Sequence, residues 1–199
     1  MKVCIIGNSP NLLENDLGEK IDSFDQVIRI NDFLIKGFEK QIGSKTTVVA
    51  AGFSSASIMV SGNYETSYCM DTCDIWVLHP DDGRIARAKE YGTGIPDNRL
   101  FVIDNKSYSF LVREIYKDFW RPVPSCGIAA IQMALEIFKG SEIFILGFDS
   151  NTGVEGKGHY YEEDFLDKDM PGDPVGHDWN AENLYIEKLI SESKIKRLS

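Results

Sequence analysis

The sequence predicts an α/β fold in which a single domain contains a Rossmann-like, mainly parallel sheet flanked by helices. Short apolar, β-branched runs alternate with segments of helical spacing along most of the chain. A hydrophobic fraction of 43% is typical of a globular protein, and no change of composition marks a domain boundary. We therefore expect residues 1–199 to form one domain, with a lid-like loop over residues 150–176.

The first predicted unit is a strand, a tight turn and a helix. Lys2 to Gly7 is an apolar strand, after which Ser9 is placed as a helix N-cap and Pro10 at the first helical position of a segment ending near Glu19. Further strands are expected over residues 26–30, 46–52, 74–78, 100–103 and 142–146. Because helical segments separate the later strands, we expect these strands to pair in parallel.

Four further helices are expected from apolar spacing. They cover residues 84–91, 107–119, 125–139 and 179–193, and Gly140 ends the third of them. The region from Asp149 to Trp179 is rich in Gly, Asp and aromatic residues and has no clear period. Loops of this length are often lids or binding loops, which is why we expect a lid here.

Charge and hydropathy exclude several classes of protein. The net charge is −10 and the basic residues are scattered, apart from a short C-terminal run, so a nucleic-acid partner is not expected. No apolar stretch approaches the ~18 residues of a membrane span or signal segment. Since Met1 leads directly into the first strand, we expect a natural start there and a soluble, cytoplasmic protein.

The cysteines and acidic residues do not predict a metal site. Cys69 and Cys73 lie close in sequence, but no second Cys or His pair accompanies them. Asp167 and Asp169 flank Lys168 in a DxD pattern, which is better interpreted as part of a solvated acidic loop. We expect neither a metal nor another cofactor.

Polar residues follow the first two strands. Asn8 and Ser9 come after the first strand and Asn31 ends the second, and parallel strands bring their carboxyl ends to one crevice. An Asn amide both donates and accepts hydrogen bonds, as recognition of a pyrimidine or a ribose hydroxyl requires. The alternative is that Asn8 and Ser9 only form a turn and a cap. Because GxGxxG is absent, a dinucleotide site is disfavoured.

A second group lies where a helix begins. Ser125, Cys126 and Gly127 open the helix over residues 125–139, and Gly147 ends the next strand. Free amides at a helix N-terminus favour a phosphate, and Gly127 would allow close backbone approach. A capped structural helix would have the same sequence, so this signal alone is weak.

Histidines form the third and fourth groups. His159 stands with Tyr160 and Tyr161 in the long loop, and His177 precedes Glu182 at the start of the last helix. The ordinary pKa of His, ~6.5, suits proton transfer near neutrality. For either His alone, a solvated loop side chain is the competing interpretation.

Taken in order, these four groups resemble the sialyl motifs of the eukaryotic-type sialyltransferase family, and more distantly bacterial sialyltransferases. The resemblance runs from Cys4 to Glu187. The family's long motif is similar to residues 4–12 together with Asp22-Ser23, Arg29-Ile30-Asn31, residues 37–39 and residues 43–46. Its short motif is similar to residues 124–127 and 146–149. Its third motif is similar to residues 159–162, and its very short motif is similar to His177 with Glu182.

The resemblance implies an inverting single displacement from a CMP-sialic acid donor to a glycan acceptor hydroxyl. It implies that Asn8 and Asn31 bind cytidine monophosphate, that Ser125 and Gly127 contact its ribose and phosphate, and that Gly147 lines the nucleotide pocket. His159 would stabilise the leaving phosphate and His177 would be the general base. Glu182 would support the last helix or His177. Ser9, Cys126, Tyr160 and Tyr161 complete the expected donor site, either tyrosine hydroxyl being able to reach the phosphate.

The chain also departs from that family. The family's disulfide would join Cys4 to a cysteine near Gly140, where this chain has none, which favours a reducing compartment. We also expect this chain to differ from the family's Golgi enzymes in having no membrane anchor or stem, and the segment between the two large motifs is short. Two alternatives stay open: a nucleotide or CMP-sugar binding module without transferase activity, or a transferase of another CMP-activated sugar such as Kdo.

Overall fold

The computed structural model describes residues 1–53, 72–91, 96–116, 123–148, 160 and 177–199. Within these residues, seven strands form one sheet in the order β5-β4-β3-β2-β1-β6-β7. The strands are β1 Lys2–Ile6, β2 Gln26–Ile30, β3 Val48–Ala51, β4 Asp74–Val77, β5 Leu100–Val102, β6 Glu142–Leu146 and β7 Lys196–Arg197. Each pairing between neighbouring strands is parallel, which confirms the predicted fold class.

The strand order reverses direction at β1. Strands β2 to β5 follow one another on one side of β1, whereas β6 and β7 lie on the other side. In the register, Ile6 of β1 lies opposite Arg29 of β2 and Leu146 of β6, so the three strands end level. Since ligands of open parallel sheets bind where the order reverses, the crevice is expected beyond Ile6 and Leu146.

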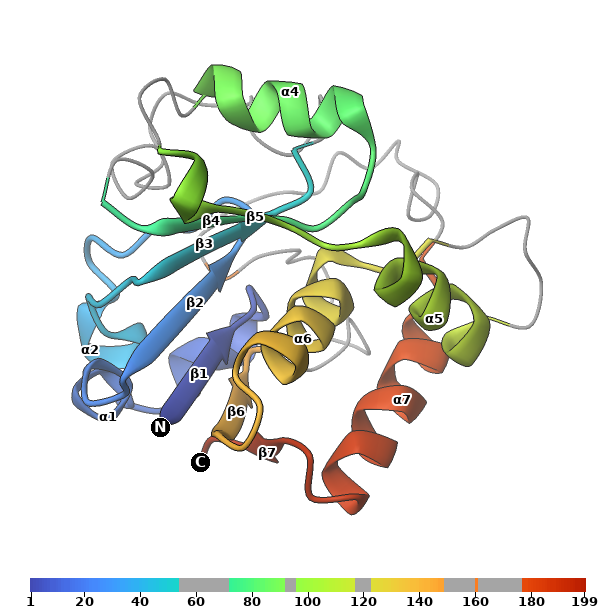
Figure 1. The fold of residues 1–199 in the computed structure, drawn as a ribbon. Helices are drawn as coiled ribbons and strands as arrows, with labels where there is room; N and C mark the ends of the chain where they lie inside the picture. The colour runs from blue at the N-terminus through green and yellow to red at the C-terminus, as the bar shows by residue number, and fades with distance from the viewer. Residues whose placement is uncertain (54–71, 92–95, 117–122, 149–159, 161–176) are drawn as a thin grey trace, which may run out of the picture.

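Three long helices cover one face of the sheet: α5 Asn105–Ile115, α6 Cys126–Ile137 and α7 Trp179–Ser191 (Figure 1). Ile5, Ile28 and Trp76 point to this face and pack with buried residues of α6, among them Ile131 and Ala134. The Trp76 ring stacks on Phe138, with 5.8 Å between ring centroids. Burial of this apolar surface is the main source of stability for the sheet-helix layer.

The opposite face is covered by shorter elements. They are η1 Pro10–Glu14, α1 Gly18–Asp22 and α2 Glu39–Ile42 beside β1 and β2, and α4 Asp82–Tyr91 beside β4 and β5. Leu12, Ile21 and Ile42 pack there against Cys4 and Val27. The sheet is thus the middle layer of three, as alternation of strands and helices requires.

The predicted elements differ from the structure in a few places. Ser9 does cap a helix with Pro10 at its start, but that helix is a single 3₁₀ stretch, because Asn15 is extended and interrupts the chain before α1. The helix expected to reach Phe119 ends at Ile115, where Tyr116 turns to extended geometry. The elements α2, β7 and the 3₁₀ turn η2 Asp97–Arg99 were not predicted.

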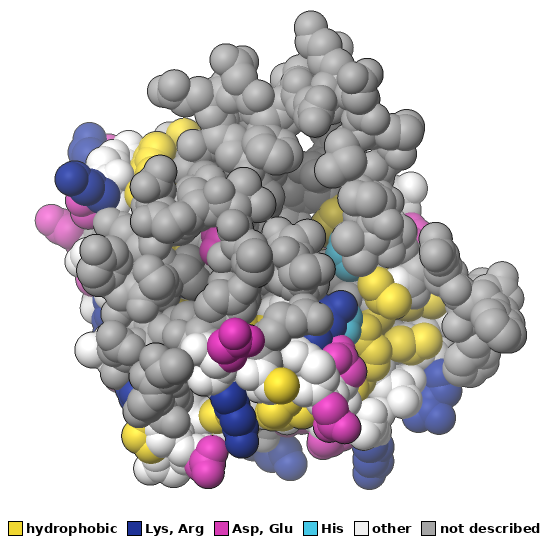
Figure 2. Space-filling model, turned by 90° about the horizontal axis from the view of Figure 1, so that it is seen from above, with side chains coloured by type: hydrophobic (Ala, Val, Ile, Leu, Met, Phe, Trp, Pro, Cys, Tyr) yellow, Lys and Arg dark blue, Asp and Glu magenta, His cyan; other side chains and the backbone are white. Residues whose placement is uncertain are grey.

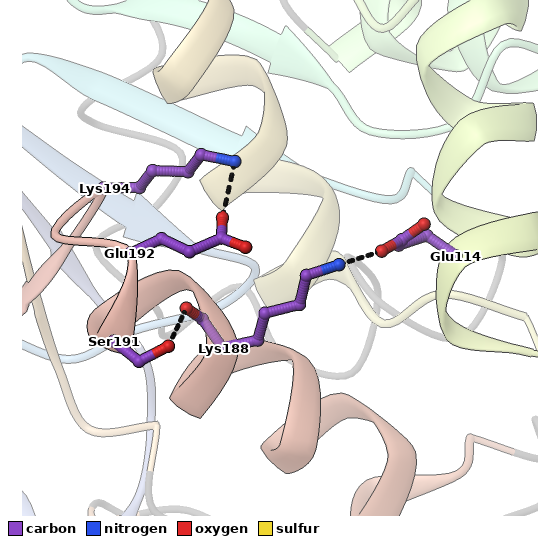
Figure 3. A network of polar contacts seen from close by, with 5 residues as sticks. All are labelled: Glu114, Lys188, Ser191, Glu192 and Lys194. Atoms are coloured by element: carbon purple, nitrogen blue, oxygen red, sulfur yellow. Dashed lines mark hydrogen bonds and ion pairs between the residues drawn. The ribbon is translucent and has the colours of Figure 1, made fainter.

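Surface polar contacts link α7 to its neighbours. Lys188 of α7 forms an ion pair with Glu114 of α5, and the Ser191 hydroxyl donates to the Lys188 carbonyl at 2.8 Å (Figure 3). Lys194 pairs with Glu192 just beyond the helix. Exposed pairs of this kind contribute little, so the apolar face of α7 does most of the anchoring. Among the described residues, no helix is long and apolar enough to cross a membrane.

Candidate functional site

The site begins where β1 and β6 end side by side. The Gly7 amide donates to Leu146 O at 2.8 Å, and the Ser9 amide donates to Gly147 O at 3.2 Å. Gly147 has a φ of +73°, and a Cβ on Gly7 would meet its carbonyl oxygen at 2.2 Å. Both positions therefore need glycine, and the backbone of the crevice floor is fixed by this contact.

Asn8 ties the end of β1 to the end of β2. Its Nδ2 donates to Ile30 O and to Asp32 O, at 3.0 Å each. Both amide hydrogens are therefore used by backbone, and a bound nucleotide would meet the side chain through its oxygen. Ser9 caps η1 through its Oγ, which accepts from the Asn11 amide at 3.4 Å. Ser9 therefore forms the predicted cap, whereas the Asn8 side chain links two strand ends; the predicted contacts of both residues with the donor stay predictions.

In the sequence, Asn31 lies between Ile30 and Asp32, whose carbonyl oxygens accept hydrogen bonds from Asn8. It has a φ of +54°, a left-handed geometry that Asn tolerates better than most residues. Its Oδ1 accepts from the Gly52 amide after β3 at 3.3 Å, and its side chain also hydrogen-bonds the Cys126 thiol. Asn31 therefore connects the ends of β2 and β3 to the first turn of α6.

The start of α6 lies across the crevice from Asn31. Ser125 is the N-cap, and its Oγ accepts from the Ile128 amide at 3.3 Å. A Cβ on Gly127 would lie 2.9 Å from the Phe148 ring, so glycine permits close packing here. Burial raises the pKa of the Cys126 thiol to about 11, although Asn31 and Arg84 oppose the shift. The thiol is therefore protonated at neutral pH.

A buried carboxylate supports this helix start. The Glu182 side chain in the first turn of α7 is 3% exposed. Its Oε1 accepts from the Ser125 amide at 2.7 Å and from the Tyr116 hydroxyl at 2.6 Å, and its Oε2 accepts from Ser125 Oγ at 2.6 Å. Burial, followed by the bond to Glu182, raises the pKa of Tyr116. Because the Ser125 hydroxyl and amide both donate to Glu182, the Ser125 side chain would meet a ligand only as an acceptor.

His177 is held beside the same segment. Its Nδ1 lies 2.7 Å from the carbonyl oxygen of Val123, two residues before the N-cap of α6. Its ring meets Trp179 edge-on, with 5.2 Å between centroids. His177 and Ser125 are far apart in the sequence, whereas the fold places the His177 ring against the short segment Val123–Ser125.

Tyr160 packs beneath the crevice on the other side. Its hydroxyl donates to Leu34 O at 2.7 Å and accepts from the Leu34 amide at 3.0 Å. Its own amide donates to Asn8 O at 3.0 Å, and its ring packs edge-on against Phe38. The expectation that this hydroxyl reaches the phosphate stays a prediction. His159 and Tyr161 lie outside the described residues, as does most of the expected lid over residues 150–176.

Several residues at this edge were missed by the sequence reasoning. His79 lies two residues after the end of β4 and packs against Tyr108 of α5 at 5.0 Å between centroids, and Arg84 of α4 donates to Gly52 O at 2.8 Å. His79 occupies the strand-end position that Asn8 and Asn31 occupy in their strands, so the same reasoning could have identified it. Tyr116 carried no local signal, because its partner Glu182 is far away in sequence.

Seen from above, histidine side chains lie next to a lysine or arginine and to a hydrophobic patch (Figure 2). In the described residues, no group of three or more His, Cys, Asp and Glu side chains is arranged to hold a metal ion. A strand-order reversal, asparagines just after two neighbouring strands and a helix N-terminus beside them are the features of a doubly wound α/β protein, whose ligands bind at the strand ends where the order reverses.

Comparison with known proteins identifies the family. The family described as "Glycosyltransferase family 29 (sialyltransferase)" matches residues 1–194, and the chain belongs to it. One human relative, "CMP-N-acetylneuraminate-beta-galactosamide-alpha-2,3-sialyltransferase 4", is 24% identical over 213 residues, covering 98% of this chain and 63% of the relative. A mouse "Type 2 lactosamine alpha-2,3-sialyltransferase" is 25% identical over 98% of this chain and 64% of the relative. The chain thus spans less than two thirds of the length of these relatives.

Solved structures support the fold independently. A structure titled "Crystal Structure of a Mammalian Sialyltransferase" superposes with a TM-score of 0.72 at 22% identity, covering 99% of this chain and 68% of that chain. A second, "in complex with Gal-beta-1-3GalNAc-ortho-nitrophenol", gives a TM-score of 0.66 at 23% identity, with the same two coverages. The Rossmann-like architecture predicted from the sequence is therefore that of the mammalian enzymes.

Proposed function

We propose that this chain is a sialyltransferase that moves sialic acid, or a related nonulosonate, from a CMP-activated donor to a hydroxyl of a glycan acceptor. Family membership supports the reaction class, and the names of the curated relatives give CMP-N-acetylneuraminate as donor and galactosides as acceptors. The observation that carries the proposal for this chain is the hydrogen bond between His177 and Val123.

That hydrogen bond fixes which ring nitrogen can act as a base. A carbonyl oxygen only accepts, so Nδ1 at 2.7 Å from Val123 O carries the proton. In the neutral ring, Nε2 then carries the lone pair. His177 would remove the proton of the acceptor hydroxyl through Nε2 while that oxygen attacks the anomeric carbon. The bond to cytidine monophosphate breaks in the same step, which inverts the configuration.

The leaving phosphate needs stabilisation of its negative charge. The amides of Ile128 and Ala129 are bonded to Ser125 Oγ and Ser125 O, so the amides nearest the open end of α6 are those of Cys126 and Gly127. Amides at a helix N-terminus, together with the helix dipole, favour a phosphate. We propose that these two amides bind it, with Asn8, Asn31 and Gly147 around the nucleotide. His159 is proposed to assist departure of the phosphate, and Tyr161 to contact the donor.

We propose that the transfer needs no metal ion. A CMP-sugar has one phosphate, whereas metals commonly bridge the two phosphates of a nucleoside diphosphate. The Asp167 and Asp169 pair, the acidic match in the sequence, lies outside the described residues. The cytoplasmic location is likewise a proposal, and subcellular fractionation with an antibody against this chain would test it.

The decisive experiment measures transfer and donor hydrolysis together. The protein is incubated with CMP-N-acetylneuraminate, with and without a galactose-ended acceptor, and products are separated by chromatography. We expect acceptor-dependent transfer, with a product anomer opposite to that of the donor by NMR. Donor binding without transfer or hydrolysis would favour the binding-module alternative. Turnover of CMP-Kdo in place of CMP-N-acetylneuraminate would favour the other CMP-sugar.

A further inference from the structure

A cluster of polar side chains around one arginine lies at the ends of β3 and β4, next to the proposed phosphate site. We call Arg84, His79 and Tyr108 the Arg84 cluster; its members come from α4, the end of β4 and α5. Arg84 donates to Gly52 O at 2.8 Å, and the Tyr108 ring packs on His79. A Cβ on Gly52 would lie 2.9 Å from Cys126 Sγ and 3.2 Å from Arg84 Nη1, so both groups converge over this glycine. The cluster is therefore in contact with the first turn of α6.

Asp81 sets the direction of the Arg84 side chain. Its Oδ2 lies 2.8 Å from Arg84 Nε, and its Oδ1 accepts from the Arg84 amide at 3.0 Å. Among the described residues, the guanidinium therefore contacts Asp81 through Nε and donates to Gly52 O through Nη1, and a guanidinium has five N–H donors in all. Asp81 is 57% exposed, whereas Arg84 is 25% exposed, so the carboxylate faces water and the guanidinium reaches inward.

The charge of Arg84 acts on the groups around the crevice. Its positive charge lowers the pKa of His79 in the same direction as burial, and it opposes the larger effect of burial, which raises the pKa values of Tyr108 and Cys126. Burial and Arg84 together lower the pKa of His79 to about 4, and the charge of His177 contributes in the same direction. His79 is therefore neutral near pH 7, and His177 lies near enough to it to interact electrostatically. In a chain with a net charge of −10, an anionic ligand needs a nearby cation, and the Arg84 guanidinium, paired with Asp81 through Nε, supplies one here.

The order of residues along the sheet edge indicates which anionic group of the donor would contact Arg84. The proposed nucleotide contacts lie at the ends of β6, β1 and β2, and the Asn31 side chain hydrogen-bonds the Cys126 thiol in the first turn of α6. Gly52, His79 and Arg84 continue beyond Asn31 toward β4, on the side where His177 interacts with His79. The base removes the proton of the acceptor hydroxyl that attacks the anomeric carbon, so with His177 as the base the donor sugar would occupy this side. In a sialic acid, that carbon bears both the phosphate oxygen and a carboxylate.

We propose that Arg84 binds the carboxylate of the donor sugar, so that the site binds a CMP-nonulosonate more tightly than CMP alone. The inference rests on the proposed function and extends it to a specificity-determining residue. A guanidinium pairs with a carboxylate through two parallel N–H bonds, a geometry that a neutral hydroxyl in the same place would not match. A Cβ on Gly52 would lie 3.2 Å from Arg84 Nη1 and 3.7 Å from His79 Cδ2, so the guanidinium and the His79 ring both lie against this glycine.

The test compares two ligands on one variant by isothermal titration calorimetry. The ligands are CMP, which has no carboxylate, and CMP-3-fluoro-N-acetylneuraminate, whose fluorine slows departure of the sugar. Arg84→Gln is expected to raise the Kd of the fluorinated donor by about tenfold to a hundredfold, as loss of a charge-assisted pair would, and to leave that of CMP nearly unchanged. Lys89→Gln removes one positive charge from the same helix at an exposed position and should change neither Kd.

The outcomes separate the inference from the proposed function. If wild type binds neither ligand, the proposed function fails and the inference fails with it. If wild type binds both and Arg84→Gln weakens both equally, Arg84 reads the phosphate or only supports the fold, and the carboxylate assignment is wrong. Unchanged affinity for both ligands also overturns it. Arg84→Lys, which keeps the charge but not the paired donors, should recover part of the lost donor affinity if the carboxylate is the target.

Discussion

The Glu182 carboxylate accepts hydrogen bonds from both the backbone amide and the hydroxyl of Ser125, at 2.7 and 2.6 Å. Ser125 is the N-cap of α6, and Glu182 lies in the first turn of α7. The same Val123–Ser125 segment receives the hydrogen bond of His177 through the Val123 carbonyl. One buried carboxylate therefore fixes the proposed phosphate site and the segment that orients the proposed base.

Glu182→Gln should destabilise the protein by about 2 kcal/mol or more, because a buried donor would lose its acceptor. The carboxylate receives three donors from Tyr116 and Ser125, whereas an amide has one oxygen and places its NH₂ group against the others. Urea denaturation followed by circular dichroism measures the loss.

Glu187→Gln on the same helix is the matched control, because Glu187 is 59% exposed and pairs with Arg197 at the surface. Its effect should stay within about 0.5 kcal/mol. Equal effects of the two substitutions would show that the Glu182 contacts add nothing to stability.

Gly7→Ala should be severely destabilising. Its Cβ would lie 2.2 Å from the Gly147 carbonyl oxygen, a backbone atom that can move only if β1 and β6 separate. We expect a loss of more than about 3 kcal/mol or insoluble protein, beyond the usual range for point substitutions. Gly83→Ala in α4 meets only Asp81 Oδ1, at 3.3 Å, and should be neutral or slightly stabilising, since alanine favours helix. Thermal melts of both variants decide whether the strand-end contact is as rigid as its geometry implies.

Removal of divalent metal should leave transfer intact. An assay with CMP-N-acetylneuraminate is run with EDTA and then with added manganese. We expect equal rates, because a single phosphate can be bound by the α6 amides alone. Loss of activity with EDTA and recovery with manganese would contradict metal independence and make Asp167 and Asp169 candidates for ligands.

The sheet could be predicted closely from sequence because its strands are continuous apolar runs that end at polar residues. The run Glu142 to Leu146 became β6 with the predicted bounds, and Gln26 to Ile30 became β2. The short helix Glu39–Ile42 and the two-residue strand Lys196–Arg197 were missed, since neither has enough residues for a periodic signal. Tertiary contacts define such elements.

The candidate site was predictable where its residues end strands or begin helices, because strand direction alone brings those positions together. Asn8, Asn31 and Ser125 are residues at strand ends or helix starts. What they contact was less predictable: Asn8 gives both amide hydrogens to backbone, and Ser125 gives its hydroxyl proton to Glu182. These partners lie 22 to 57 residues away in sequence, and only the packed fold reveals them.

His79 should make the stability depend on pH. Burial lowers its pKa from 6.5 to about 4 in the folded protein. Between these values the unfolded chain binds a proton that the folded chain does not, so the free energy of unfolding falls as pH falls from 6.5 to 4. Each pKa unit corresponds to about 1.4 kcal/mol, so the full loss is up to about 3 kcal/mol.

His79→Phe tests this dependence, because phenylalanine can still pack against Tyr108 but does not titrate. Urea denaturation of wild type and variant at a series of pH values between 6.5 and 4 gives the difference in slope. We expect the variant to lose less stability over this range. Parallel curves would show that His79 is protonated equally easily in both states, contrary to its burial.

His177 should be required for turnover and not for donor binding. His177→Ala removes the nitrogen that carries the lone pair, and loss of a general base typically costs about 10²–10⁴-fold in kcat. His177→Asn is the sharper variant, because its amide can still donate to Val123 O, which the ring meets at 2.7 Å in wild type, but it has no basic nitrogen. If His177 acts as the base, both variants lose turnover while their Kd for CMP-3-fluoro-N-acetylneuraminate, from calorimetry, stays near that of wild type. If His177 only fixes the Val123 segment, His177→Asn instead keeps most of its activity, and the general base must be another residue.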